Sequence, residues 1–194
     1  KAVLGFVPVG SNKRVIDQHR AGWAAKPSLR AVYEDLHRRS LALCKEGGLL
    51  EIGGGSGHIK TYAPHAICLD IQHAPWLDVI ADAHQLPFPD SSFENIVMLD
   101  VLHHLAYPRT FLAEALRVLK PGGRLVITEP GVSPVSWLIY NLLHDEPATL
   151  GADLWNDAPQ TGARPEEANQ AIPHLMFYAH AKKLAAEFPD MKII

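Results

Sequence analysis

The spacing of apolar residues predicts helices in the first part of the chain. Residues 13–25 have a mixed pattern that we expect to be helical, and Pro27 interrupts it. A second helix is predicted to follow with Ser28 as its N-cap, because apolar residues recur there at roughly helical spacing. A pair of glycines ends this pattern, so residues 1–46 form a predicted N-terminal helical cap.

Beyond this cap, short apolar runs alternate with glycine-rich, polar or helical stretches. The runs predict strands at 49–52, 65–70, 77–82, 93–99 and 124–128. A helix over residues 111–119 and a turn at Lys120-Pro121-Gly122-Gly123 precede the last strand. Strands that alternate with helical segments are typical of an α/β fold, in which helices cover both faces of a parallel sheet.

Residues 131–174 break this alternation. They are rich in Pro, Gly, Asn and Asp and contain Trp137 and Trp155, and a stretch of this length predicts an insertion or a lid. Residues 175–188 are predicted to be helical again, and 191–194 resemble the start of a strand. We therefore expect a single domain over residues 1–194. Its parts are a cap at 1–46, a core at 47–130, an insertion at 131–174 and a return to the core at 175–194.

The composition narrows the class of protein. The 194 residues are 47% hydrophobic and 20% charged, which excludes a disordered chain, a collagen and a coiled coil. The formal net charge of -3 disfavours a wholesale nucleic-acid binder. Cys44 and Cys68 lack metal-like spacing and favour a reducing cytoplasm over a disulfide framework. No apolar run reaches the length of a membrane span.

The most informative stretch is the glycine turn Glu51-Ile52-Gly53-Gly54-Gly55-Ser56-Gly57, directly after the first predicted strand. Such a turn lets a ligand approach bare backbone, and it aims the N–H groups of a following helix into the crevice. The dinucleotide fingerprint G-x-G-x-x-G is not met, because His58 stands at its last position. Taken alone, the glycine turn is explained equally well as a tight strand-to-helix connection that binds no ligand.

Carboxylates stand at the ends of the next two predicted strands. Asp70 follows Gly53 by 17 residues, where a carboxylate can accept hydrogen bonds from both ribose hydroxyls of a nucleoside. Asp82, followed by Ala83, could take the amino group of an adenine. Taken alone, each carboxylate is interpreted as an ordinary turn residue. Together with the glycine turn, at the same edge of the predicted sheet, the two carboxylates favour an adenosine ligand.

Taken together, the motifs resemble the class I S-adenosylmethionine-dependent methyltransferases, most closely their type 11 small-molecule branch. The resemblance covers about residues 48–130 and rests on Leu49–Gly57, Asp70, Ala81–Phe88, Phe93–Val97, Val101–Leu105 and Leu116–Gly123. It implies a Rossmann-like, doubly wound, mostly parallel sheet of seven strands with an insertion after the fifth. Because the chain stops where a sixth strand would begin, we expect the last strands to be missing.

The resemblance implies S-adenosylmethionine as cofactor and S-adenosylhomocysteine as product. Glu51 would fix the amino end of the cofactor, Asp70 would hold its ribose, and Leu99 would offer a carbonyl near the sulfonium. The whole set implied for cofactor binding is Glu51, Gly53, Gly54, Gly55, Gly57, Asp70, Ile71, Asp82, Ala83 and Leu99, with Gln72 as a further neighbour of the adenine.

His103 and His104 would face the transferring methyl group and are the candidate catalytic residues. A general base is needed only if the acceptor is a poorly acidic hydroxyl or a protonated amine, and the family has this pair where no histidine is catalytic. No metal is expected, because the two residues are adjacent and no cysteine completes a ligand set. The residues that we expect around the acceptor are His19, Arg20, Trp23 and His144, the last within His144-Asp145-Glu146.

The predicted function is methyl transfer to an oxygen or nitrogen of a small molecule, with a sugar or glycan precursor suggested by the Trp, Asn and Asp content of the insertion. One alternative is a module of the same fold that binds the cofactor without catalysis. A nicotinamide oxidoreductase is disfavoured by His58, and a nucleic-acid methyltransferase by Asp100–His104, which lacks a base-methylase motif. We expect a cytoplasmic protein without nucleic-acid or membrane partners, and we leave open whether it is a homodimer.

Overall fold

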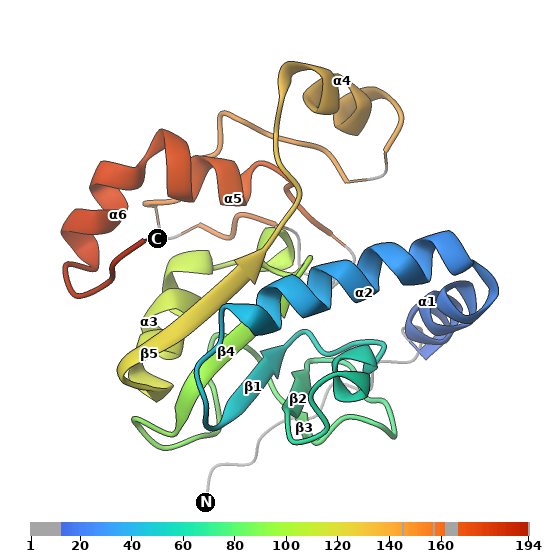
Figure 1. Cartoon of the computed structure of the whole chain (residues 1–194). Coiled ribbons are helices and arrows are strands. Elements are labelled where there is room, and N and C mark those ends of the chain that lie inside the picture. The colour runs from blue at the N-terminus through green and yellow to red at the C-terminus, as the bar shows by residue number, and fades with distance from the viewer. Residues whose placement is uncertain (1–12, 145, 157, 162–166, 194) are drawn as a thin grey trace, which may run out of the picture.

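A computed structural model describes residues 13–144, 146–156, 158–161 and 167–193. Its centre is a sheet of five parallel strands in the order β3-β2-β1-β4-β5, seen at the middle of Figure 1. The strands are β1 (Leu49–Ile52), β2 (Ile67–Asp70), β3 (Val79–Ile80), β4 (Phe93–Leu99) and β5 (Leu119–Thr128). The order places β1 and β4 at the centre, next to the point where the chain reverses its direction across the sheet.

Helices cover both faces of this sheet, with α2 and α3 on opposite sides (Figure 1). The helices are α1 (Lys13–Ala25), α2 (Pro27–Ala42), α3 (Pro108–Val118), α4 (Pro134–Leu142), α5 (Ile172–His174) and α6 (Ala181–Glu187). The described residues also contain three short helical elements. These are the 3-10 turns η1 (His58–Thr61) and η2 (Leu102–His104) and the π-helical η3 (Leu175–Ala179). The architecture is the predicted α/β Rossmann-like fold.

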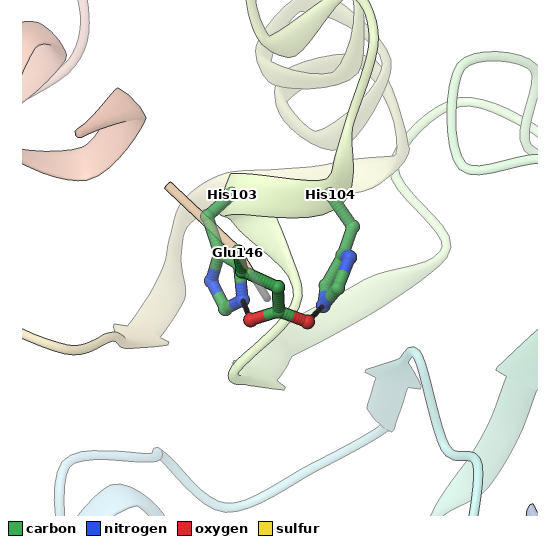
Figure 2. A group of neighbouring side chains, drawn as sticks. All are labelled: His103, His104 and Glu146. Atoms are coloured by element: carbon green, nitrogen blue, oxygen red, sulfur yellow. Dashed lines mark ion pairs between the residues drawn. The ribbon is translucent and has the colours of Figure 1, made fainter. Parts of the chain in front are cut away.

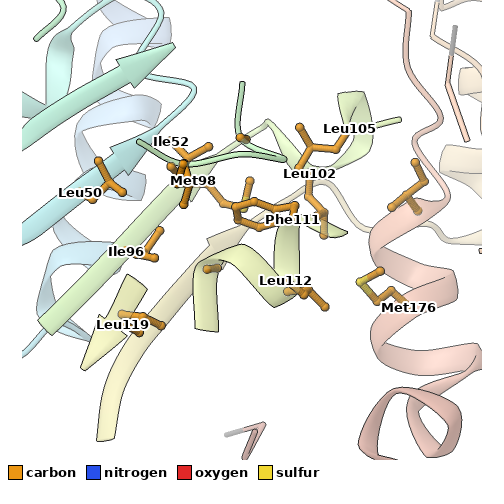
Figure 3. Close-up of a cluster of buried hydrophobic side chains, with 14 of the residues drawn as sticks. Leu50, Ile52, Ile96, Met98, Leu102, Leu105, Phe111, Leu112, Leu119 and Met176 are labelled. Carbon is orange, nitrogen blue, oxygen red and sulfur yellow. The ribbon is translucent and has the colours of Figure 1, made fainter. Parts of the chain in front are cut away.

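The core divides into two clusters because successive side chains of a strand point to opposite faces. Leu50, Ile96 and Met98 pack with Phe111 of α3 in the larger cluster, which Figure 3 shows. Their neighbours Leu49 and Val97 face the other way, into a smaller cluster bordered by Leu41 of α2. Every residue of β1 is buried, including the charged Glu51, because the strand lies at the centre of a parallel sheet.

The predicted strands at 49–52 and 93–99 are confirmed residue by residue. The strands predicted at 65–70 and 77–82 are shorter in the structure. Strand β2 begins only at Ile67, and β3, at the sheet edge, pairs only through Val79 and Ile80. The predicted turn at 120–123 lies inside β5, where Gly122 has a φ of +72°. Among the described residues the sheet has five strands, against the seven that the resemblance implies, and residues 191–193 form no strand.

Two further expectations about helices are wrong. The N-cap of α2 is Lys26 and not Ser28, because Pro27 occupies the first helical position, where no N–H is needed. The glycine turn leads only into the four residues of η1 and not into an α-helix, since β2 begins soon afterwards at Ile67. Backbone N–H groups at this turn therefore come from the loop itself.

The insertion contains a helix that its composition did not predict. The apolar stretch after Ser133 forms α4, with Ser133 and Ser136 in a reciprocal capping box. Its side chains include exposed apolar residues, namely Val135, Leu138, Ile139 and Leu142. None of the helices in the described ranges has the length and hydropathy needed to span a bilayer.

Candidate functional site

The glycine turn after β1 has the open backbone that its sequence predicts. Gly53 and Gly57 both have a φ of +71°, in the left-handed region that disfavours other residues. A Cβ atom on Gly53 would lie 2.3 Å from Val101, and one on Gly57 would lie 2.5 Å from Trp76. Because neither position has room for a side chain, the turn must be built from glycine.

Asp70 holds this turn from the tip of β2. Its Oδ2 accepts a hydrogen bond of 2.9 Å from the N–H of Gly55, and its Oδ1 accepts one of 2.8 Å from Gln72. Burial raises the pKa of the Asp70 carboxyl, while the backbone donors of Gln72, Gly55 and Ile71 act in the opposite direction. Each carboxylate oxygen retains a second lone pair for a ligand hydroxyl.

Glu51 lies beneath the same turn, at a position where a carboxylate is costly. Its side chain is buried, its Oε2 has no hydrogen-bond partner, and a Cβ on Gly54 would lie 2.9 Å from that oxygen. Burial raises the pKa of Glu51 to about 7. A buried carboxylate with one unpartnered oxygen beside open backbone is suited to a ligand that brings a positive charge.

The residues expected around the adenine lie near the strand tips. Asp82 is engaged by His84, which donates from its backbone N–H at 2.9 Å and places its ring Nδ1 2.6 Å from Oδ1. Ile71 is exposed, and Ala83 is buried in the core. Gln72 has a buried Oε1 without a partner, which leaves a polar atom for a ligand at this end.

Helix α1 packs against the glycine turn through aromatic contacts. Trp23 stacks on His58 with ring centroids 3.9 Å apart, and the guanidinium of Arg20 lies 4.0 Å from the centre of the Trp76 ring. Trp76 in turn donates a hydrogen bond of 2.7 Å to the carbonyl of Gly55. Arg20 and Trp23, expected near the acceptor, thus contact Trp76 and His58 beside the glycine turn, while the His19 side chain lies outside the described part of the structure.

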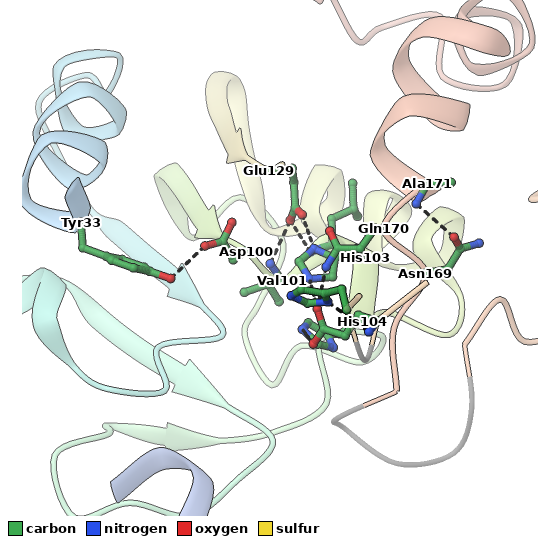
Figure 4. Close-up of polar contacts among 12 residues, drawn as sticks. Tyr33, Asp100, Val101, His103, His104, Glu129, Asn169, Gln170 and Ala171 are labelled. Carbon is green, nitrogen blue, oxygen red and sulfur yellow. Dashed lines mark hydrogen bonds and ion pairs between the residues drawn. The ribbon is translucent and has the colours of Figure 1, made fainter. Parts of the chain in front are cut away.

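His103 and His104 lie on η2, just after β4. The Nδ1 of the buried His103 is hydrogen-bonded to Oε2 of Glu129, and Oε1 of Glu129 accepts from the N–H groups of Val101 and Leu102 (Figure 4). The two imidazole rings have centroids 4.3 Å apart. Glu129 therefore fixes both η2 and the orientation of the His103 ring.

Glu146 of the insertion reaches both histidines. Its two oxygens lie 3.8 Å from Nε2 of His103 and 3.7 Å from Nε2 of His104, as Figure 2 shows. By contrast, His144 is exposed and its Nδ1 accepts a hydrogen bond of 3.1 Å from the N–H of Glu146. The insertion thus contributes Glu146 to this cluster, and His144 is not part of it.

Asp100 and Tyr33 also belong to this region, and the sequence did not indicate either. Asp100 has a φ of +56°, unusual for a residue other than glycine, and its Oδ2 accepts a hydrogen bond of 3.2 Å from the Tyr33 hydroxyl (Figure 4). Burial and the nearby Glu129 raise the pKa of Asp100, and burial beside Asp100 raises the pKa of Tyr33 to about 12. Leu99, just before them, ends β4 beside Thr128.

Comparison with known proteins agrees with this geometry. Residues 50–127 match the model of a methyltransferase domain family, Methyltransf_11. The chain is 51% identical over 57 residues to a demethylmenaquinone methyltransferase of Clavibacter sepedonicus, a match that covers 29% of this chain and 23% of the relative. It is 33% identical over 120 residues to the ubiquinone/menaquinone biosynthesis C-methyltransferase UbiE of Bartonella bacilliformis, covering 50% of this chain and 45% of the relative.

A solved structure extends the likeness to the fold. An S-adenosylmethionine-dependent methyltransferase from Thermotoga maritima superposes with a TM-score of 0.54 at 25% identity, over 60% of this chain and 58% of its own. The family-model match and this superposition agree with the fold of a class I S-adenosylmethionine-dependent methyltransferase. The match to the methyltransferase family model covers residues 50–127, which is less than half of the chain. The chain spans less than half the length of the two curated relatives.

The residues present fit the cofactor of this family, S-adenosylmethionine. The unpartnered Oε2 of Glu51 suits the α-ammonium group of its methionine part, and the open backbone of the glycine turn suits close approach. Asp70 has lone pairs for the two ribose hydroxyls. When bound, the cofactor would supply the electrophilic methyl group, and the protein would supply position and charge.

The contact between Gly57 and Trp76 predicts the effect of adding one methyl group. Gly57→Ala should lower the free energy of unfolding by about 2 kcal/mol, because alanine is strained at positive φ and its Cβ would displace the Trp76 ring. Urea unfolding of both proteins measures the change. The control, Gly151→Ala, has open space and should stay within about 0.5 kcal/mol of the parent; equal losses in the two variants would contradict the assigned contact.

Proposed function

We propose that this protein transfers the methyl group of S-adenosylmethionine to a small aromatic acceptor of the quinol class. The observation that carries the proposal is that two carboxylates, Glu51 with its unpartnered oxygen and Asp70, lie at one glycine turn within residues that match a methyltransferase domain. The names of the relatives, which act on demethylmenaquinone or in ubiquinone and menaquinone biosynthesis, favour the quinol over the sugar expected from composition.

The surroundings of the histidine cluster support an acceptor with an apolar part. Helix α4 brings Tyr140 close to the cluster, and burial together with the charges of Asp100 and Glu146 raises the pKa of this tyrosine. The same helix exposes Val135, Leu138 and Leu142. An acceptor with a hydrocarbon tail could cover these side chains, which a sugar would leave in water.

His104 is the better candidate of the pair to act on the acceptor. Its side chain is 26% exposed, against 3% for His103. Burial and the neighbouring His103 lower the pKa of His104, which therefore stays neutral near pH 7 and retains a lone pair. Activation of the acceptor hydroxyl would raise electron density on the ring, whose carbon forms a bond to the methyl group while the methyl–sulfur bond breaks and the ring proton leaves.

The proposal is tested by incubating the protein with methyl-labelled S-adenosylmethionine and a reduced, demethylated quinol with a short prenyl tail. We expect label on the quinol and a kcat/KM about a hundredfold lower in His104→Ala, as general acid–base groups commonly contribute. His65→Ala, which changes an exposed histidine elsewhere, should transfer as the parent does. Label on a sugar acceptor instead would favour the polar acceptor, and binding of the cofactor without transfer would favour the non-catalytic module.

A further inference from the structure

We propose that His103, His104 and Glu146 bind a divalent transition-metal ion. One ligating atom from each residue lies within 4.8 Å of the others, namely the two ring nitrogens and a carboxylate oxygen. Figure 2 shows the carboxylate between the two rings. The expectation that adjacent histidines without a cysteine bind no metal does not anticipate Glu146, which comes from the insertion more than 40 residues later.

The distances in this cluster suit an ion better than direct hydrogen bonds. At 3.7 and 3.8 Å, the Glu146 oxygens are too far from the two Nε2 atoms to accept hydrogen bonds from them. Ligands about 2.1 Å from a tetrahedral ion stand about 3.4 Å apart. Small side-chain shifts would therefore bring the three ligating atoms to coordination distance.

The ring of His103 is held in the orientation and tautomer that coordination needs. Its Nδ1 is hydrogen-bonded to Glu129, and because a carboxylate accepts, Nδ1 carries the hydrogen. Nε2, the atom that faces Glu146, is then left with its lone pair. A carboxylate behind a ligating histidine is the usual outer support of a protein metal site.

Glu146 is held in place as well. The buried Gln170 donates a hydrogen bond of 2.6 Å to its Oε2, and the N–H of the neighbouring Asn169 donates one of 2.9 Å to the carbonyl of His103. The segment that positions Glu146 is thus tied to η2 itself. The cluster is a supported arrangement of ligands and not an encounter of surface side chains.

The ligand types indicate the class of ion and its use. Two imidazoles and one carboxylate suit zinc, iron, cobalt or manganese, whereas magnesium prefers oxygen ligands. Three protein ligands leave a coordination position open, as in catalytic zinc sites. In the proposed methyl transfer, on which this role rests, the ion would replace His104 as the group that activates the acceptor, because His104 would then be a ligand and not a base. The ion would lower the pKa of the acceptor hydroxyl, whose proton goes to water before the ring carbon attacks the methyl group.

Binding is tested on the full chain, stripped of metal with a chelator and titrated with zinc by calorimetry and with cobalt by visible absorption. We expect one ion per chain with a dissociation constant of micromolar or below, ligand-field bands for cobalt, and no saturable magnesium binding. His104→Ala and Glu146→Gln should each weaken zinc binding at least a hundredfold, whereas His65→Ala should not change it.

Two outcomes would overturn the site: no saturable zinc binding by the folded parent, or unchanged affinity in His104→Ala and Glu146→Gln. Glu146→Gln keeps the size of the side chain and an oxygen for Gln170, so it tests ligation even if His104→Ala unfolds. Cofactor titration of the metal-free chain reports separately on the methyltransferase site. Equal transfer rates with and without zinc would overturn the role of the ion in transfer.

Discussion

Asp70→Ala is expected to weaken S-adenosylmethionine binding by at least about a hundredfold. The carboxylate can accept hydrogen bonds from both ribose hydroxyls, and hydrogen bonds to a charged group contribute about 1.5–3 kcal/mol each. Two at the lower end give about 3 kcal/mol, which corresponds to a little over a hundredfold in the dissociation constant. The variant also loses the acceptor of the Gly55 N–H, so the glycine turn is less well ordered before the cofactor arrives.

Calorimetric titration measures this change, and circular dichroism confirms that the variant is folded. The matched control is Asp90→Ala, which removes an exposed carboxylate that pairs with Arg117 away from the glycine turn. We expect the control to bind the cofactor as the parent does. Equal affinities of Asp70→Ala and the parent would remove Asp70 from the cofactor site.

Cofactor affinity is expected to increase about tenfold from pH 6 to pH 8. The pKa of Glu51 is about 7 in the free protein, so the fraction of ionised Glu51 increases from about one tenth to about nine tenths over this range. Only the ionised carboxylate attracts the α-ammonium group of the cofactor. Bound cofactor should therefore lower the pKa of Glu51 and release a proton below pH 7.

Glu51→Gln isolates this contribution, because the cofactor's own amino group titrates equally with both proteins. The variant should bind more weakly at pH 8 and lose most of the pH dependence. The folded pKa of Glu51 is above its unfolded value near 4.5, so its contribution to stability is present at low pH and is lost as the pH rises through 7. A Glu51→Gln protein with the full tenfold dependence would contradict the assigned contact.

The parts of the fold that the sequence predicted well are those that short-range patterns determine. The runs 49–52 and 93–99 are mostly apolar and mostly buried at the centre of the sheet, so pattern and structure coincide. At the edge, β3 keeps only two paired residues of the six predicted, because pairing there depends on a neighbour that the sequence pattern does not reveal. Local spacing alone also predicted the glycine turn after β1 and the position of Asp70 at the end of β2.

The remaining site residues depend on contacts between distant segments. Trp76 lies 21 residues from its partner Gly55, and Glu129 lies 26 residues from His103. Tyr33 reaches Asp100 across 67 residues of chain. No periodicity or motif reports such pairs, although the carboxylates at the ends of β4 and β5 occupy the edge where sites form in open sheets.

The central claim is that the glycine turn, with Glu51 and Asp70, binds S-adenosylmethionine. The most direct measurement is calorimetric titration of the folded chain with S-adenosylmethionine and S-adenosylhomocysteine, with a reduced nicotinamide dinucleotide as comparison. We predict one site per chain with micromolar affinity for both sulfur compounds and no binding of the dinucleotide. A folded chain that binds neither sulfur compound, or that binds the dinucleotide instead, would contradict the claim.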